Sequence, residues 1–388
     1  MSAALPVWGM SLWGLLFWAC ISLVLYAYVG YPLLVALLAR VRGTRPHLGD
    51  ECPAITVVVA AHDEERTIGA RIRNLLSQDY PATRLKVLVV SDGSGDRTAA
   101  EADVGDPRVT VIDLPHNVGK AMAINAALAR VDTRLVAFAD ARQQFAVDAL
   151  RHLVAPFADP EVGLVSGELV IRPADGDPVG HGVGLYWRME KSLRANEARI
   201  GWLHGATGAI HAMRRDLFRP LPAGTVLDDM WMPLQVLLAG RRVWMARDAI
   251  AIDRASQDSG EEFRRKLRTL AGNWQLLARL PVLIDPLRNP VFFAWFSHKL
   301  LRLLVPWALL LALLASAAAA GTSQTYLVLL VLQVLGYVGA AIALVLPRLA
   351  AHVPLLPTAG SFVVLNFAAL LSLPAMLASD PARLWKKH

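Results

Sequence analysis

Charged residues are absent from three long stretches of this 388-residue chain, which is 55% hydrophobic and only 18% charged. The charge-free stretches are residues 1–39, 303–347 and 353–379. Each exceeds the roughly 20 apolar residues that a transmembrane helix needs. This distribution excludes the possibility that the whole chain folds as a single soluble domain. It predicts an N-terminal transmembrane anchor in residues 1–40 and a C-terminal transmembrane region of about three hydrophobic segments in residues 303–379.

The N-terminal apolar run is far longer than the ~7–15 residues of a signal-peptide core, and no basic residue precedes it. We therefore interpret it as a retained anchor. Arg40, Arg42 and Arg45 follow it, so the positive-inside rule predicts an inner-membrane protein whose central domain faces the cytosol. Four full spans would place the basic C-terminal residues outside the cell. Either residues 353–379 form a re-entrant or interfacial hairpin, or the charge rule fails here.

Other patterns are also missing. The chain has only two cysteines, so no disulfide framework is expected. It lacks both Gly-x-Gly-x-x-Gly and Gly-Lys-Ser/Thr motifs, which disfavours a dinucleotide oxidoreductase and a P-loop ATPase. Its net charge of +7 comes without a basic stripe interleaved with aromatic residues, so we expect membrane lipids and no nucleic acid among its partners.

The segment from 53 to 280 has the pattern of an α/β domain. Short runs rich in β-branched residues alternate with helical patterns, and the first four runs are nearly continuous in apolar residues. Such runs are typical of strands buried on both faces of a mostly parallel sheet. The predicted strands are 55–60, 86–90, 109–114, 135–139 and 162–170, and the predicted crossover helices are 65–78, 120–130 and 147–157.

Polar residues gather where three of these strands end. They occupy residues 61–65 after the first strand, 91–96 after the second and 140–142 after the fourth. In open α/β sheets the ligand lies beyond the carboxyl ends of the strands. A single acidic residue at such a place is more often a turn or cap residue. Three sets on one edge indicate a binding site.

The polar segments resemble the opening of the inverting family 2 glycosyltransferases, in residues 57–65 (VVVAAHDEE) and 88–94 (LVVSDGS). Further similarity lies in residues 117–120 (NVGK), 205–209 (GATGA) and 227–229 (LDD). The flanking apolar segments resemble the branch that contains cellulose, chitin and hyaluronan synthases. The resemblance covers about residues 55–277. It implies a nucleotide-sugar-binding domain of the glycosyltransferase A type, flanked by transmembrane helices.

The resemblance also implies roles for single residues. Asp229 matches the acidic residue that acts as general base, and Thr207 and Gly208 are implied to bind the acceptor. The residues implied to contact the donor nucleotide are Ala60, His62, Glu64 and Asp92, with Asp92 on the uracil of a UDP-sugar.

Sugar transfer with inversion requires an acceptor hydroxyl to lose its proton while a nucleoside diphosphate departs with growing negative charge. A carboxylate within hydrogen-bond reach of the hydroxyl suits the first task. We expect Asp229 to act there with Asp228 beside it, because a like charge and partial desolvation both raise a carboxylate's proton affinity. The alternative for Asp229 is a helix cap, since residues 230–239 have a helical pattern.

The departing diphosphate needs positive charge, which a bound cation usually supplies. The family's Asp-x-Asp contacts the nucleotide and its cation, but here Arg142 occupies the second position and cannot bind a cation. Asp140 is the candidate ligand for Mg²⁺ or Mn²⁺, since Mg²⁺ keeps several waters and few protein ligands. Arg142 either points away or meets the diphosphate itself. Lys120, at the start of a predicted helix, is a further candidate phosphate contact.

A basic cluster stands where the polymerising synthases carry Gln-x-x-Arg-Trp. Its members Arg265, Lys266 and Arg268 are candidate diphosphate contacts. Thr269 replaces the Trp that helps hold the acceptor sugar in the synthases, which argues against processive polymerisation. Trp274 is a candidate acceptor contact, with packing or interface anchoring as the alternative.

Residues 286–302 mix aromatic and basic residues, which predicts an interfacial helix that sets the catalytic crevice against the bilayer. The leading hypothesis is an inverting hexosyltransferase or N-acetylhexosaminyltransferase that uses a nucleotide sugar, expected to be a UDP-sugar. Its acceptor is a lipid-linked or other glycan. The alternatives are a processive polysaccharide synthase, with export partner proteins, and a degenerate nucleotide-sugar sensor or scaffold.

Overall fold

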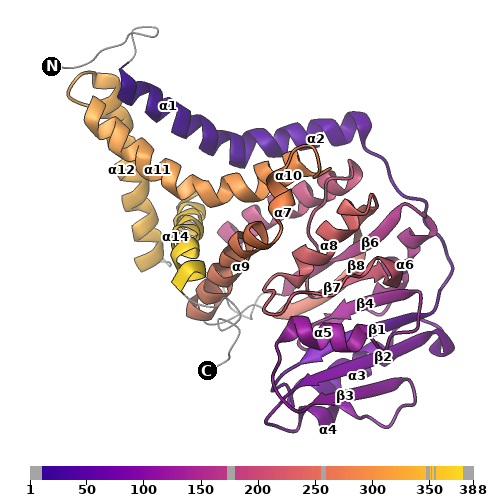
Figure 1. The fold of residues 1–388 in the computed structure, drawn as a ribbon. Coiled ribbons are helices and arrows are strands. Elements are labelled where there is room, and N and C mark those ends of the chain that lie inside the picture. Colours follow the sequence, from indigo (N-terminus) through magenta and orange to yellow (C-terminus); the bar gives the residue numbers. More distant parts are fainter. Residues whose placement is uncertain are drawn as a thin grey trace.

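The computed structural model describes residues 11–172, 180–254, 259–346, 350, 352–353 and 355–378. An eight-stranded sheet forms the centre of the α/β domain, in the order β3-β2-β1-β4-β7-β6-β8-β5 (Figure 1). The strands are β1 Ile55–Ala61, β2 Leu85–Asp92, β3 Val109–Leu114, β4 Leu135–Ala139, β5 Gln144–Phe145, β6 Val162–Arg172, β7 Ile210–Arg214 and β8 Arg242–Arg254.

The half of the sheet that carries the predicted polar edge is parallel. Strand β1 pairs in parallel with both β2 and β4, and β2 pairs in parallel with β3. The other half is mixed, because β7 runs antiparallel to its neighbours β4 and β6 while β8 runs parallel to β6. The predicted α/β class and the five predicted strands are confirmed, with ends shifted by two residues at most. Strands β5, β7 and β8 lie outside the predicted set.

Both faces of the sheet are covered by helices. Along β1, Val58 points into a core with α5 (Lys120–Leu128) and α8 (Asp228–Leu238), while Val57 and Val59 point into a core with α3 (Ile68–Leu76) and α6 (Ala149–Val154). Successive side chains of a strand face opposite sides of a sheet, so a strand buried on both faces must be apolar throughout. This is why β1 reads as a continuous apolar run.

Among the described residues, four helices are long and apolar enough to cross a membrane. The first is Leu12–Arg42, in which α1 (Leu12–Leu25) and α2 (Tyr31–Arg42) join through a π-helical turn, Tyr26–Gly30. The second is Phe292–Ala319, which ends in α11 (Leu301–Ala319) and packs beside α1 (Figure 1). The others are α12 (Gln324–Val345) and α14 (Leu356–Ala378).

Two segments differ from their predicted form. Residues 286–302 do not make a separate interfacial helix: 286–291 are turns, and from Phe292 onward the chain already belongs to the second apolar helix. Leu356–Ala378 is one continuous helix, so the hairpin alternative for residues 353–379 is wrong. Apolar sequence runs do not reveal where a helix starts when aromatic and basic residues continue its pattern.

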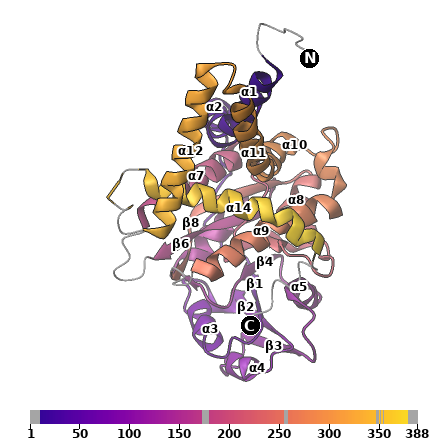
Figure 2. The ribbon, with the colours of Figure 1, turned by 90° about the vertical axis from the view of Figure 1, so that its left-hand side faces the viewer.

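Two long helices lie between the sheet and the apolar helices. They are α7 (Gly180–Arg199), which contacts α2 and α14, and α9 (Ser259–Arg279), which packs along α14. In Figure 2, α14 crosses over α9 above the sheet. These two helices therefore connect the α/β domain to the apolar helices.

Candidate active site

Lys120 is the centre of a cluster of carboxylates, which we call the carboxylate cluster: Lys120, Asp140, Asp228 and Asp229. Its ammonium nitrogen lies 3.0 Å from Asp140 Oδ1 and 3.2 Å from Asp228 Oδ2. Burial lowers the pKa of Lys120, but the three carboxylates outweigh this effect and raise it above its usual range. Lys120 is therefore a permanent positive charge at the carboxyl ends of the parallel strands.

Asp229 has the properties that a general base requires. Burial raises the pKa of its carboxyl to about 6, and the negative charge of Asp228 adds to this effect, while Lys120 opposes it. Asp228 and Asp229 are the first two residues of α8, and Leu227 holds the cap position, so the cap alternative for Asp229 is wrong. A carboxyl with a pKa near 6 is ionised at neutral pH and still basic enough to accept a proton.

Gly208 brings the cluster close to the backbone of the segment that precedes β7. A Cβ atom placed on Gly208 would lie 3.6 Å from Asp140 Oδ2, 3.6 Å from Asp229 Oδ2 and 3.9 Å from the Lys120 nitrogen. Two carboxylate oxygens therefore face one small space over a residue without a side chain. This juxtaposition joins β4, α8 and the predicted acceptor segment, which are far apart in the sequence.

Asp92 is linked to this site by the loop that precedes Lys120. Its two carboxylate oxygens accept hydrogen bonds from the backbone N–H groups of Val118 and Gly119, at 2.8 and 2.9 Å. The residue is only 2% exposed. Asp92 thus holds the loop from which Lys120 projects. Its predicted contact with a uracil ring stays a prediction.

Two arginines lie close to Asp140, and one of them, Arg142, stands where the family's Asp-x-Asp motif has its second aspartate. Arg71 is buried and donates from Nε to the backbone carbonyl of Asp140 at 3.1 Å. Arg142 donates from Nη2 to Asp253 Oδ2 on β8, at 3.0 Å. Its guanidinium is therefore bound to a carboxylate of the protein, and its side chain remains about half exposed.

The three basic residues predicted to meet a diphosphate occupy one helix, α9, but have different surroundings. Arg268 faces the carboxylate cluster: burial lowers its pKa, while Asp228, Asp229 and Asp140 raise it. Lys266 pairs with Glu262 one turn away at 2.8 Å, and Arg265 is exposed. Of these three, Arg268 is the one placed near the carboxylates.

The other predicted contacts lie along the same edge or behind it. His62 hydrogen-bonds through Nδ1 to the Asp92 carbonyl, and the Glu64 backbone N–H donates to Thr98 Oγ1. The Thr207 backbone N–H donates to Ser166 Oγ at 3.1 Å. Trp274 donates its indole N–H to Ser372 Oγ of α14, at 3.0 Å, which joins α9 to the last apolar helix.

Besides Arg71, two residues near the cluster were not singled out by the sequence motifs. His211 on β7 is fully buried and stacks on Phe138; burial lowers its pKa to about 4, so the ring is neutral at neutral pH. Arg194 on α7 donates to the carbonyl of Gly205, at 3.2 Å, and its charge lowers the pKa of Asp229. His211 is near the cluster because β7 runs antiparallel beside β4, and Arg194 is near it because of how α7 packs. Neither placement can be predicted from the neighbouring sequence.

A small cavity, partly open to solvent, lies at the cluster. Its walls come from β1, α5, β4, the predicted acceptor segment and α8, and the lining residues are Val58, Ala60, Lys120, Ile124, Phe138, Ala139, Asp140, Gly208 and Asp228. Ala60, Lys120, Asp140 and Gly208, which the sequence predicted as binding residues, therefore share one cavity.

The oxygen atoms of the cluster fit a hard divalent cation. Mg²⁺ and Mn²⁺ prefer carboxylate, phosphate and water oxygens. Asp140 Oδ2 and Asp229 Oδ2 both face the space above Gly208. Asp140 is the ligand consistent with the predicted site, because it stands where the family's Asp-x-Asp begins.

Comparison with known proteins shows which protein family this chain resembles. The model of the family "Glycosyl transferase family 2" matches residues 56–221. An N-acetylglucosaminyltransferase from Rhizobium sp. (strain N33) is 30% identical over 270 residues, which cover 64% of this chain and 60% of that protein. One from Bradyrhizobium elkanii is 36% identical over 123 residues, which cover 30% of this chain and 67% of that protein. The chain spans less than two thirds of the length of the longer-matching relatives, such as the Rhizobium protein.

A solved structure is similar over most of the chain. It is the mannosyltransferase PcManGT from Pyrobaculum calidifontis in complex with GDP-Man and Mn²⁺, with 25% identity and a TM-score of 0.69. The match covers 92% of this chain and 99% of that one. The similarity therefore extends over the apolar helices as well as the α/β domain.

Proposed function

We propose, from the premise that the chain belongs to glycosyltransferase family 2, that it is a membrane-bound inverting glycosyltransferase using a nucleoside-diphosphate sugar. The acceptor is a lipid-linked or other glycan at the membrane surface, on the cytosolic side that the basic residues after the first apolar helix favour. The observation that carries the proposal is the convergence of four charged side chains: Lys120, Asp140 and Asp228 line one cavity, and Asp229 faces the space above Gly208, which lines the same cavity.

In the proposed reaction, Asp229 accepts the proton of the acceptor hydroxyl. The hydroxyl oxygen forms a bond to the anomeric carbon as the bond from that carbon to the diphosphate oxygen breaks, on the opposite face of the sugar. The electron pair leaves with the nucleoside diphosphate, and the fixed charges of Lys120 and Arg268 stabilise it. A divalent cation held by Asp140 would supply further positive charge for the diphosphate when bound. Asp92 positions the loop that carries Lys120.

Two donors follow from the comparisons. The relatives named N-acetylglucosaminyltransferase suggest UDP-N-acetylglucosamine, in keeping with the UDP-sugar expected from the sequence. The mannosyltransferase structure suggests GDP-mannose. We propose UDP-N-acetylglucosamine first, because several relatives with that name each match more than half of this chain.

The direct test is a screen of nucleotide sugars for thermal stabilisation of the purified full-length protein in detergent. A donor that binds the folded state raises its apparent stability by mass action, by about 2.7 kcal/mol at 100 times its dissociation constant. The stabilising donor is then supplied with membrane lipid extract, with and without chelator, and sugar transfer is measured. Donor binding without transfer or donor hydrolysis under any condition would support the sensor alternative instead.

Product length separates the two enzymatic outcomes. Thr269, in place of the aromatic residue of the polymerising synthases, leads us to propose single addition. Mass spectrometry of the product should show one added sugar per acceptor. A ladder of longer products would identify a processive polysaccharide synthase.

A further inference from the structure

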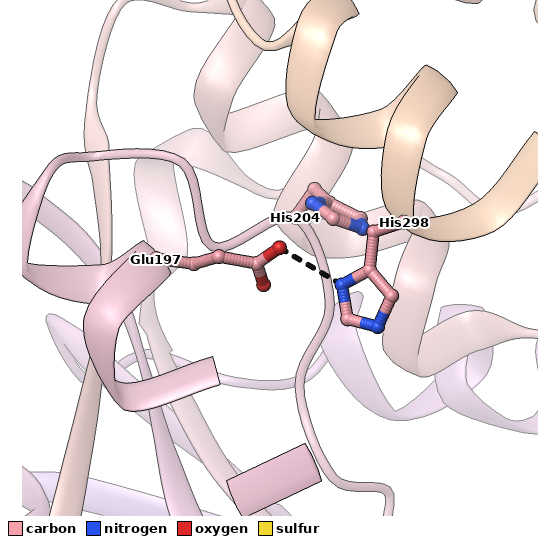
Figure 3. Close-up of side chains that lie close together, drawn as sticks. All are labelled: Glu197, His204 and His298. Atoms are coloured by element: carbon pink, nitrogen blue, oxygen red, sulfur yellow. Dashed lines mark hydrogen bonds and ion pairs between the residues drawn. The ribbon is translucent and has the colours of Figure 1, made fainter. Parts of the chain in front are cut away.

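A second cluster of titratable side chains lies where the α/β domain meets the apolar helices. It consists of Glu197 near the end of α7, His204 in the following loop and His298 in the π-helical turn Phe296–Leu300 of the second apolar helix. We call these three residues the junction cluster; Figure 3 shows them turned toward one another. They are 0%, 1% and 1% exposed. The cluster shares no residue with the carboxylate cluster.

The hydrogen bonds around the junction cluster leave lone pairs without a donor. His204 bonds through Nδ1 to the carbonyl of Trp202 at 3.0 Å, so Nδ1 carries the proton and Nε2 is a free acceptor. Within the described part of the chain, His204 Nε2 and Glu197 Oε2 are buried and have no hydrogen-bond partner. Unpaired buried acceptors destabilise a fold unless another group satisfies them.

The remaining bonds orient the three side chains from outside. The Tyr31 hydroxyl donates to Glu197 Oε1 at 2.7 Å, and His298 Nδ1 lies 2.8 Å from the same oxygen. His298 Nε2 lies 2.8 Å from Glu190 Oε1, and Arg302 holds the other oxygen of Glu190. His298 thus has a carboxylate at Nε2, and His204 has a backbone carbonyl at Nδ1. Partners of these two kinds typically orient the imidazole rings that bind a metal through their other nitrogen.

We propose that the junction cluster binds one zinc ion through His204 Nε2, His298 Nδ1 and the Glu197 carboxylate. One potential ligand atom from each residue lies within 4.8 Å of the others. On binding, zinc takes the place of the proton on His298 Nδ1, which is released to solvent. Three protein ligands leave the fourth position of tetrahedral zinc to water.

The ligand types select zinc over the cation expected at the carboxylate cluster. Two imidazole nitrogens and one carboxylate suit Zn²⁺, whereas Mg²⁺ and Mn²⁺ prefer oxygen ligands throughout. The three ligands come from α7, the loop before β7 and an apolar helix. The ion therefore ties the catalytic domain to the membrane-facing helices.

The test uses the full-length protein in detergent. Zinc per chain is measured by elemental analysis after dialysis against metal-free buffer. The metal-stripped protein is then titrated with Co²⁺, whose visible d–d absorption reports four-coordinate nitrogen and oxygen ligands. We expect about one zinc per chain, an intense Co²⁺ band that added Zn²⁺ abolishes, and a rise in melting temperature with Zn²⁺.

Two variants locate the ion. His204→Gln should lose the zinc and the Co²⁺ band, whereas Asp140→Asn, in the other cluster, should retain both. The wild-type spectrum decides the question even if His204→Gln does not fold. Folded wild-type protein without bound zinc and without a Co²⁺ band would overturn the proposal and leave a hydrogen-bonded network. Equal zinc in folded His204→Gln would likewise overturn it, by showing adventitious binding elsewhere.

Discussion

The carboxylate cluster and the junction cluster both place carboxyl groups beside basic nitrogen atoms, but in different surroundings. In the carboxylate cluster the Asp140 and Lys120 side chains are 34% and 18% exposed and line a cavity. In the junction cluster all three side chains are fully buried. Tyr31 and Glu190 hold Glu197 and His298 from other elements, and the Trp202 carbonyl holds His204 within its own loop. Groups that a substrate can reach are available for proton transfer, whereas sealed groups hold elements together. Each prediction below perturbs one side of this comparison.

Removing the base is expected to have the largest effect. Asp229→Asn keeps the shape of the side chain but cannot accept a proton, so transfer should fall by about 10²–10⁴-fold. Donor binding, measured by thermal shift, should survive. The matched control is Asp132→Asn, because Asp132 is an exposed aspartate of the same domain that pairs with Lys86. Transfer at the wild-type rate in Asp229→Asn would refute the assignment.

Breaking the junction cluster should affect stability more than chemistry. Glu197→Ala leaves the Tyr31 hydroxyl and His298 Nδ1 without their buried acceptor. Removing one partner of a buried, charged hydrogen-bonded pair costs about 3–5 kcal/mol. The melting temperature should fall clearly below that of Glu101→Ala. That variant removes a surface carboxylate of α4 (Thr98–Ala102), which pairs with Arg97 just before the helix. Equal melting temperatures would show that the junction cluster contributes little to stability.

The pH dependence of transfer should follow Asp229. Its carboxyl has a pKa of about 6, and the base must be ionised, so the rate should rise as the pH increases through about 6. Lys120 lowers this pKa, so Lys120→Met should move the midpoint upward, by about one to three units. The midpoint is read from the pH profile of kcat, which separates it from weaker donor binding. A downward shift would show that another group limits the acidic side.

Adding a methyl group at Gly208 tests the space between the carboxylates. A Cβ atom there makes ordinary contacts at 3.6 Å, so Gly208→Ala should fold. It fills the space that both carboxylate oxygens face, and transfer should fall by roughly 10- to 100-fold through misplaced reactants. Gly321→Ala is the control, because a Cβ atom on Gly321 meets nothing within 4 Å. Unchanged transfer in Gly208→Ala would place the reacting atoms elsewhere.

Arg142→Ala should have the smallest effect. The guanidinium is bound to Asp253 and its side chain is 47% exposed, so the loss of stability should stay within about 1 kcal/mol. If Arg142 remains on Asp253 during the reaction, transfer should fall by less than about tenfold, which corresponds to 1.4 kcal/mol. A much larger loss in transfer, with unchanged melting temperature, would show that Arg142 contacts the diphosphate.

The parallel half of the sheet could be predicted from local patterns because strands buried on both faces must be continuously apolar. Strands β7 and β8 could not, since each pairs with strands distant in the chain, and their sequences carry polar residues such as His211 and Arg242. At the site, the motifs identified Lys120, Asp140, Asp228 and Asp229. They did not identify Arg71 or Arg194, whose long side chains reach the site from helices outside the motifs.

The amino-acid sequence by itself determined which segments are apolar enough to leave water, where the strands of the parallel half run, and which acidic residues end them. Those properties depend on the period and hydrophobicity of neighbouring residues. Only the tertiary structure decided that Lys120 sits between Asp140 and Asp228, that Arg142 binds Asp253, and that His298 meets Glu197. Such pairings depend on distances between elements far apart in the chain, which no local pattern encodes.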